Sequence, residues 1–115
     1  IGVQSSVCLF EGFMDFLSFK TLEKLGDERV CVGELCDYIV LNSVANLQRC
    51  LQRLGAYEHV YCFLDNDKAG MDGCRMVSNT YPTKVIDMSD NYREYKDVND
   101  CLIGREKYEW KRKET

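Results

Sequence analysis

The sequence of 115 residues lacks the ligand pattern of a zinc site, because it has one histidine, His59, and no Cys-x-x-Cys pair among its seven cysteines. It also lacks a basic excess, and its net charge of −4 argues against a nucleic-acid binder held by a broad basic surface. No apolar run approaches the length that spans a bilayer, and no signal-peptide pattern, repeat or low-complexity segment is present. We therefore expect a cytoplasmic protein that contacts no membrane, with its cysteines packed as small apolar side chains in a reducing compartment.

The composition fits one compact domain with a real core, since 45% of the residues are hydrophobic and 11% are aromatic. Charge is spread unevenly along the chain. Residues 104–115 carry five basic and three acidic groups, which leaves a net charge of −6 on residues 1–103. We expect residues 1–103 to form the domain and residues 104–115 to be a charged C-terminal tail or linker. The chain begins with Ile1 rather than Met, so we also expect it to be part of a larger protein.

Short apolar runs alternate with helical patterns along the chain. The predicted strands are residues 7–10, 37–41, 59–64 and 84–88, and the predicted helices are residues 13–25, 45–54, 71–80 and a short 97–103 with Asp97 as N-cap. The first helix is expected to bury Met14, Leu17, Leu22 and Leu25. This order predicts an α/β fold, a mainly parallel four-stranded sheet with helices on both faces.

The strand at residues 59–64 ends in two carboxylates, Asp65 and Asp67. In an extended backbone alternate side chains share a face, so these two can point at one spot. Two carboxylates that share a site repel each other unless a cation lies between them, and hard oxygen ligands suit Mg²⁺ or Mn²⁺. The alternative is an ordinary acidic turn, because Asp-Asn-Asp is also favourable turn chemistry.

A second apolar strand ends in Glu11-Gly12, where Gly12 would permit a sharp turn or a close ligand approach. Right-handed crossovers place the carboxyl ends of parallel strands at one edge of the sheet, where open α/β sheets bind ligands. Glu11 is therefore expected beside Asp65 and Asp67 as a three-carboxylate cluster. Asn42 and Ser43, which follow the strand at 37–41, are expected at the same edge.

Three segments in this order resemble the motifs of the Toprim domain: Glu11-Gly12-Phe13-Met14-Asp15, Asp65-Asn66-Asp67-Lys68-Ala69-Gly70 and Tyr95-Lys96-Asp97-Val98-Asn99-Asp100. The flanking residues look most like bacterial primases, and especially primase-like proteins of mobile elements. Two positions depart from the primase pattern. The last motif has Asn99, with an acid one place later at Asp100, and Asn42-Ser43 stands where primases usually have Gly-Thr.

The resemblance implies a Rossmann-like Toprim fold and a Mg²⁺- or Mn²⁺-dependent nucleotidyltransferase domain of DNA replication. Its partners would be single-stranded DNA, nucleoside triphosphates and other domains of the parent chain. It implies catalytic roles for Glu11, Asp65 and Asp67, which would also hold the metal. Asp15 and Asp97 would be further metal or outer-shell ligands, and Lys68, Lys96, Asn42 and Ser43 would contact phosphates.

Three alternatives stay open from the sequence. A nuclease of the same superfamily would use the same carboxylates, since metal chemistry on a phosphodiester serves both synthesis and hydrolysis. A non-catalytic module would use the sheet edge only to dock nucleic acid or a protein. A haloacid-dehalogenase-like phosphatase also uses Asp-x-Asp, but after its first strand and followed by Thr or Val, so this alternative is the weakest. A topoisomerase would need a nucleophilic tyrosine, and none of the seven tyrosines has a recognisable setting.

Overall fold

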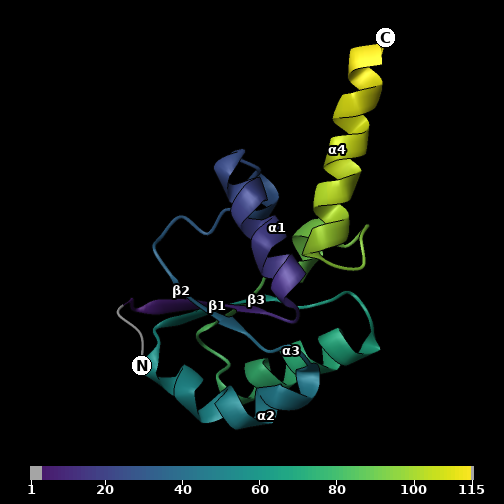
Figure 1. The fold of residues 1–115 in the computed structure, drawn as a ribbon. Coiled ribbons are helices and arrows are strands. Elements are labelled where there is room, and N and C mark those ends of the chain that lie inside the picture. Colours follow the sequence, from purple (N-terminus) through teal and green to yellow (C-terminus); the bar gives the residue numbers. More distant parts are fainter. Residues whose placement is uncertain (1–3, 115) are drawn as a thin grey trace.

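The computed structural model describes the backbone of residues 4–114 and the side chains of residues 4–113. Four strands form one sheet in the order β2-β1-β3-β4, and each neighbouring pair is parallel (Figure 1). The strands are β1 Ser6–Phe10, β2 Asp37–Val40, β3 His59–Phe63 and β4 Val85–Asp87. The predicted α/β fold with a parallel four-stranded sheet is therefore confirmed, and no strand bound differs from the expected one by more than one residue.

Helices cover both faces of the sheet, as predicted. They are α1 Phe13–Lys24, α2 Leu47–Cys50, α3 Lys68–Thr80 and α4 Val98–Glu114, with short 3₁₀ segments η1 Glu28–Val30, η2 Val44–Asn46, η3 Leu51–Ala56 and η4 Ser89–Tyr92. In Figure 1, α1 and α4 lie above the sheet and α2 and α3 lie below it.

The central strands β1 and β3 are buried on both faces, because each face packs against one helical layer. Val7, Leu9 and Val60 belong to the core under α2 and α3, together with Leu54 and Val77. The opposite core, under α1 and α4, is rich in aromatic rings. There Phe10 stacks on Phe63 with centroids 5.1 Å apart and contacts Phe19 at 5.0 Å. These two rigid strands carry the acidic residues described below.

The predicted buried face of α1 is wrong at three of four positions. Met14, Leu17 and Leu25 are 59%, 41% and 52% exposed, and of the four only Leu22 is buried. The residues that α1 buries, at helical spacing, are Asp15, Ser18, Phe19 and Leu22. Phe19 and Leu22 pack on the sheet, whereas Asp15 and Ser18 bond to the start of α4. The buried face of this helix thus combines apolar packing through Phe19 and Leu22 with polar contacts to a distant segment.

The other three helices also differ from the prediction, α3 only because it begins at Lys68, three residues earlier than expected. The segment 45–54 is α-helical only over Leu47–Cys50 and has 3₁₀ geometry on either side. The last helix does not end at residue 103 but continues to Glu114, so the predicted domain boundary falls inside α4. The helix continues through Gly104, where the Tyr95 ring packs so closely that a Cβ would come within 2.5 Å of it. The position of the domain boundary stays a prediction.

Candidate functional site

The acidic residues that follow β1 and β3 meet at the carboxyl end of the sheet. Phe10 and Phe63, the last residues of these strands, are paired in register, so Glu11 and Asp65 leave the sheet close together. One carboxylate oxygen each of Glu11, Asp65 and Asp67 lies within 4.8 Å of the others. The structure thus brings together the three residues that the sequence singled out as a cluster.

A second group of carboxylates shares Asp65 with the first. One oxygen each of Asp15, from the first turn of α1, and of Asp97, which precedes α4, lies within 4.8 Å of an Asp65 oxygen and of each other. All five carboxylates assigned to metal binding by the resemblance are therefore brought together, and we refer to them as the carboxylate cluster. Their individual roles stay predictions.

Two oxygens of the cluster are buried without a hydrogen-bond partner in the described part of the chain, Glu11 Oε1 and Asp65 Oδ1. Leaving a buried polar atom unpaired costs about 1–3 kcal/mol, and more for a charged group. A cation between these atoms would remove that cost. The donors are all carboxylate oxygens, which are the ligands that Mg²⁺ and Mn²⁺ prefer, so the cluster fits such an ion.

Burial and crowding also change the acidity of the cluster. Burial, with the neighbouring Glu11 as the next cause, raises the pKa of Asp65 to about 8. Burial raises the pKa of Asp15 to about 6, against the opposing effect of a hydrogen bond from the Asn99 backbone N–H. Without a cation, Asp65 therefore holds a proton at neutral pH, and a cation has to displace it.

Asp67 serves the fold as well as the cluster. Its Oδ1 accepts a hydrogen bond of 2.8 Å from the Gly70 backbone N–H and so caps α3, while its Oδ2 lies 4.0 Å from Lys96 Nζ. At Gly70 any Cβ would clash with the backbone carbonyl of Asp65. The glycine of the Asp-x-Asp-x-Ala-Gly motif therefore allows α3 to begin directly against the end of β3.

The sharp turn expected at Gly12 is not present, while a close ligand approach there stays a prediction. Its backbone is extended, with φ −126°, a conformation that any residue adopts, so no sharp turn requires glycine here. A Cβ would lie 3.4 Å from Asp15 Oδ2, an ordinary contact.

Asn66 is a residue that sequence reasoning missed. Its Nδ2 donates to the backbone carbonyls of Ser89, Tyr92 and Tyr95 at 3.0–3.2 Å, and its N–H donates to Lys96 O at 2.6 Å. The segment 89–96 that it fastens leads directly to Asp97. Asn66 therefore holds the two halves of the carboxylate cluster together, although the only signal in the sequence is its place between two aspartates.

The last motif divides its residues between two tasks. Asp97 Oδ1 accepts a hydrogen bond of 2.8 Å from the Asp100 N–H, so the predicted N-cap is confirmed. Asn99 turns to α1, where its Oδ1 accepts a hydrogen bond of 2.9 Å from Ser18 Oγ. Asp100 is exposed, and neither Asn99 nor Asp100 belongs to the carboxylate cluster. The asparagine that departs from the primase pattern thus links two helices.

The predicted phosphate contacts lie at different distances from the cluster. Lys96 adjoins it through Asp67, but Lys68 is 90% exposed and pairs with Asp72 on its own helix. Asn42 is exposed with φ 65°, a conformation that asparagine tolerates, and Ser43 Oγ accepts from the Ala45 N–H to cap η2. Within the described residues, no side-chain hydrogen bond or ion pair joins Lys68, Asn42 or Ser43 to the cluster, and their role with phosphates stays a prediction.

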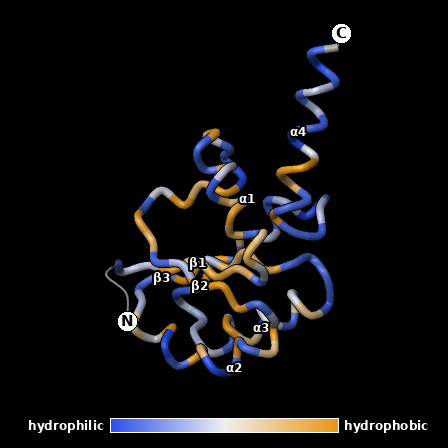
Figure 2. Tube along the Cα trace, viewed as in Figure 1, coloured by the Kyte–Doolittle hydropathy of each residue, from blue (hydrophilic) through white to orange (hydrophobic). Residues whose placement is uncertain are grey.

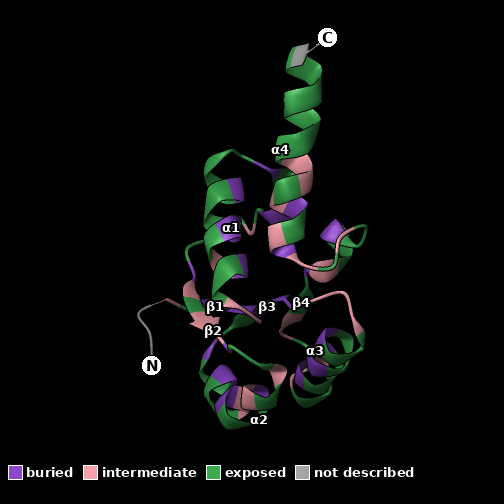
Figure 3. Ribbon diagram, turned by 45° about the vertical axis from the view of Figure 1, so that its right-hand side comes forward, coloured by how far each residue is buried: buried purple, intermediate pink, exposed green. Residues whose placement is uncertain are grey.

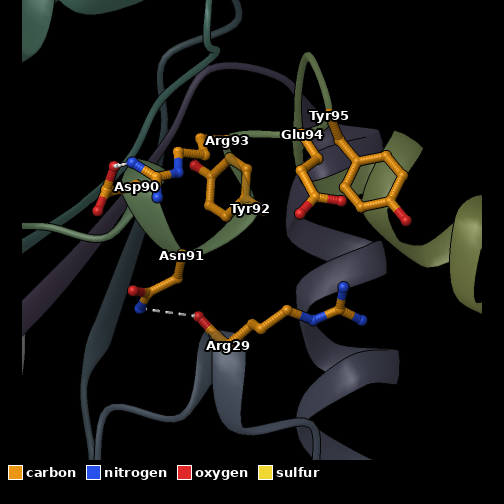
Figure 4. Close-up of a pocket in the computed structure, with 7 residues that line it drawn as sticks. All are labelled: Arg29, Asp90, Asn91, Tyr92, Arg93, Glu94 and Tyr95. Carbon is orange, nitrogen blue, oxygen red and sulfur yellow. Dashed lines mark hydrogen bonds and ion pairs between the residues drawn. The ribbon is translucent and has the colours of Figure 1, made fainter.

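A hollow of about 250 Å³ lies along η4, lined by residues 90–95 and Arg29 (Figure 4). The Asn91 amide donates to the Arg29 carbonyl at 3.2 Å, and Arg93 pairs with Asp90. No member of the carboxylate cluster lines this hollow. The described contacts around the hollow join η4 to η1, and these contacts support the segment that leads to Asp97.

Comparison with protein families matches residues 8–102 to the Toprim-like family. The chain belongs to the Toprim-like family. The match covers β2, β3, β4, the last three residues of β1 and every member of the carboxylate cluster. This is therefore a domain of the metal-dependent, nucleic-acid-processing type, with a cluster of acidic residues that fits a divalent ion. Comparison with curated proteins and with solved structures gives no match. Among the helices of residues 4–114, none is long and apolar enough to cross a membrane.

Proposed function

We propose that this Toprim-like domain catalyses Mg²⁺- or Mn²⁺-dependent nucleotidyl transfer on DNA, as a primase-like part of a larger protein. The observation that supports the proposal is the arrangement of two carboxylate groups around a shared Asp65. A shared carboxylate between two ligand groups suits chemistry in which the attacking and leaving oxygens of one phosphate are both stabilised.

A bound divalent ion would neutralise the charge of nucleotide phosphates and orient an attacking 3′-hydroxyl. Glu11, Asp65 and Asp67 would hold it, with Asp15 and Asp97 as ligands on the other side of Asp65. Lys96 presents an exposed ammonium group beside Asp67, where it would meet a phosphate as a point charge. The proposal assigns Glu11 a role as ligand, since its buried Oε1 has no hydrogen-bond partner in the described part of the chain.

The ion site is tested first, on the chain itself. We expect about 10 mM Mg²⁺ to raise the melting temperature, because a ligand that binds only the native state stabilises it. Asp65→Asn should abolish the shift, whereas Asp90→Asn, an exposed aspartate outside the cluster, should preserve it. Equal Mg²⁺ responses in both variants would contradict a site at the cluster.

The reaction is tested on the parent protein with a single-stranded DNA template. Nucleoside triphosphates and Mg²⁺ should yield new primers, and Asp65→Asn should abolish them. Cleavage of an end-labelled strand without triphosphates would instead identify a nuclease. Glu11→Gln keeps a ligand oxygen but cannot carry a proton. If it retains ion binding yet loses about 10²–10⁴-fold in activity, Glu11 is a general acid or base rather than a ligand.

A further inference from the structure

The outer half of α4 projects beyond the rest of the domain (Figures 1 and 3). Its inner half is held by the buried Val98 and Cys101 and by an ion pair of 3.0 Å between Arg105 and Asp27. From residue 106 to residue 113 every residue is exposed. The side chains of residues 106–113 therefore continue a packed helix and are open to contact with a partner.

The charge of this segment is opposite to that of the domain. Residues 105–113 contain five basic and two acidic residues, a net charge of +3. Since the whole chain has a net charge of −4, the rest of the chain has a net charge of −7. Figure 2 shows the outer part of α4 as mainly hydrophilic. The projecting helix is therefore the local exception to the acidic surface that argued against a free-standing nucleic-acid binder.

One face of this helix combines positive charge with an aromatic ring. Lys107 and Lys111 are four residues apart and share a face, with Trp110 beside them at 63% exposure. Both lysines are exposed, and within the described side chains neither forms an ion pair, unlike Arg105, which has Asp27 and Glu109. An unpaired ammonium pair with an exposed indole is a surface that offers phosphate contacts and base stacking together.

The same face leads back to the carboxylate cluster. A hollow of about 360 Å³ at its base is lined by Tyr95, Lys96, Ile103 and Lys107, among others. Lys96 Nζ lies 4.0 Å from Asp67 Oδ2. At about 1.5 Å per residue, Lys111 lies roughly 20 Å along the helix from the cluster, a distance that a few nucleotides of a single strand would span.

We propose that Lys96, Lys107, Trp110 and Lys111, here called the α4 face, bind single-stranded nucleic acid and hold the strand as it leaves the carboxylate cluster. The lysines would contact backbone phosphates, and a base would stack on Trp110. The inference rests on the proposed function for the direction of the strand, whereas the binding itself needs neither metal nor catalysis. A second copy of this chain would bring another helix with a charge of +3 to the same surface, which disfavours pairing of the two helices.

Trp110 is the only tryptophan, so its fluorescence reports on the α4 face alone. A 12-nucleotide oligothymidylate should quench it at low salt in EDTA. With about three phosphate contacts, the logarithm of the binding constant should fall with the logarithm of salt concentration with a slope of about −2. Trp110→Ala, followed with a labelled oligonucleotide, should weaken binding at least about fivefold and leave the salt slope unchanged.

A matched pair of charge reversals distinguishes the contribution of the α4 face to binding from the effect of net charge. Lys107→Glu/Lys111→Glu should weaken binding at least about tenfold. The control is Arg49→Glu/Arg53→Glu, which has the same spacing and the same change of charge. This exposed basic pair lies on the opposite side of the sheet, so its reversal should change the affinity for the oligonucleotide by less than about twofold. Asp65→Asn should bind the oligonucleotide in EDTA as well as the wild type does, which separates this test from that of the proposed function.

Three outcomes would overturn the proposal. If the oligonucleotide does not quench Trp110 fluorescence, no strand binds to the α4 face. Equal losses from the two charge reversals would show a response to net charge only. Concentration-dependent dimers in light scattering that Trp110→Ala abolishes would identify a second copy of the chain as the occupant instead.

Discussion

Cation binding by the carboxylate cluster should depend steeply on pH. The perturbation is a change from pH 6 to pH 8 during Mn²⁺ or Mg²⁺ titration of the wild-type chain. Burial beside Glu11 raises the pKa of Asp65 to about 8, and a ligating carboxylate has to be ionised. About 1% of Asp65 is ionised at pH 6 and about half at pH 8, so the apparent affinity should rise roughly 50-fold over this range.

Isothermal calorimetry gives both quantities that test this linkage. Titrations in two buffers of different ionisation enthalpy count the protons released. Binding near pH 6.5 should release about one proton from Asp65, and somewhat more because the pKa of Asp15 is raised to about 6. At pH 8 the proton release should fall to about one half as Asp65 ionises before the ion arrives.

The controls use one residue inside the cluster and one outside it. Asp65→Asn removes the titrating group and a ligand, so the remaining affinity should be low and nearly independent of pH. Asp90→Asn should behave as the wild type does. An affinity in the wild type that changes less than about threefold between pH 6 and pH 8, without proton release, would refute the linkage of ion binding to Asp65.

Three further predictions concern stability, each measured by urea denaturation. Gly70→Ala should lower the free energy of unfolding by about 1–3 kcal/mol, because the new Cβ would clash with the Asp65 carbonyl. Gly12→Ala should lower it clearly less, since Gly12 has an extended backbone and its Cβ would make only an ordinary contact. Similar losses in the two variants would contradict the packing argument. Asn66→Ala should lower the free energy of unfolding by about 1–3 kcal/mol and weaken Mn²⁺ binding, since three backbone carbonyls lose their hydrogen-bond donor. An unchanged ion affinity would show that Asn66 does not organise the cluster. Tyr92→Phe should lower the free energy of unfolding by about 1–2 kcal/mol, because the buried Tyr92 hydroxyl donates a hydrogen bond to Leu64 O at 2.8 Å. An unchanged stability would mean that water replaces this bond.

The sequence predicts the sheet and the cluster well because both depend on local order along the chain. β1 and β3 are short apolar runs, and a carboxylate directly after each run falls at the same edge once the strands are parallel. Glu11 and Asp65 could therefore be placed together from sequence. Their burial, and the raised pKa of Asp65, depend on packing that only the structure shows.

The features that escaped prediction depend on contacts between distant segments. Asp15 and Ser18 bond to Asn99, more than 80 residues away, on the face of α1 that packs on the sheet through Phe19 and Leu22, and this face leaves Met14 and Leu17 exposed. Hydrophobic periodicity along one helix carries no information about such a partner. Asn66 likewise looks like a turn residue, although its three carbonyl acceptors lie 23–29 residues later.

The ends of three helices explain how the domain keeps five carboxylates in one place. Asp15 lies in the first turn of α1, and Asp67 and Asp97 cap α3 and α4 with one oxygen each. Helix N-termini carry partial positive charge and free N–H groups, which stabilise adjacent carboxylates. Asp65 has no such helix position, and burial raises its pKa to about 8, further than that of Asp15 in the first turn of α1, which rises to about 6. Three segments of backbone, 11–15, 65–67 and residue 97, thus organise the cluster before any ion binds, and the ion would displace the Asp65 proton and bind between Asp65 and Glu11.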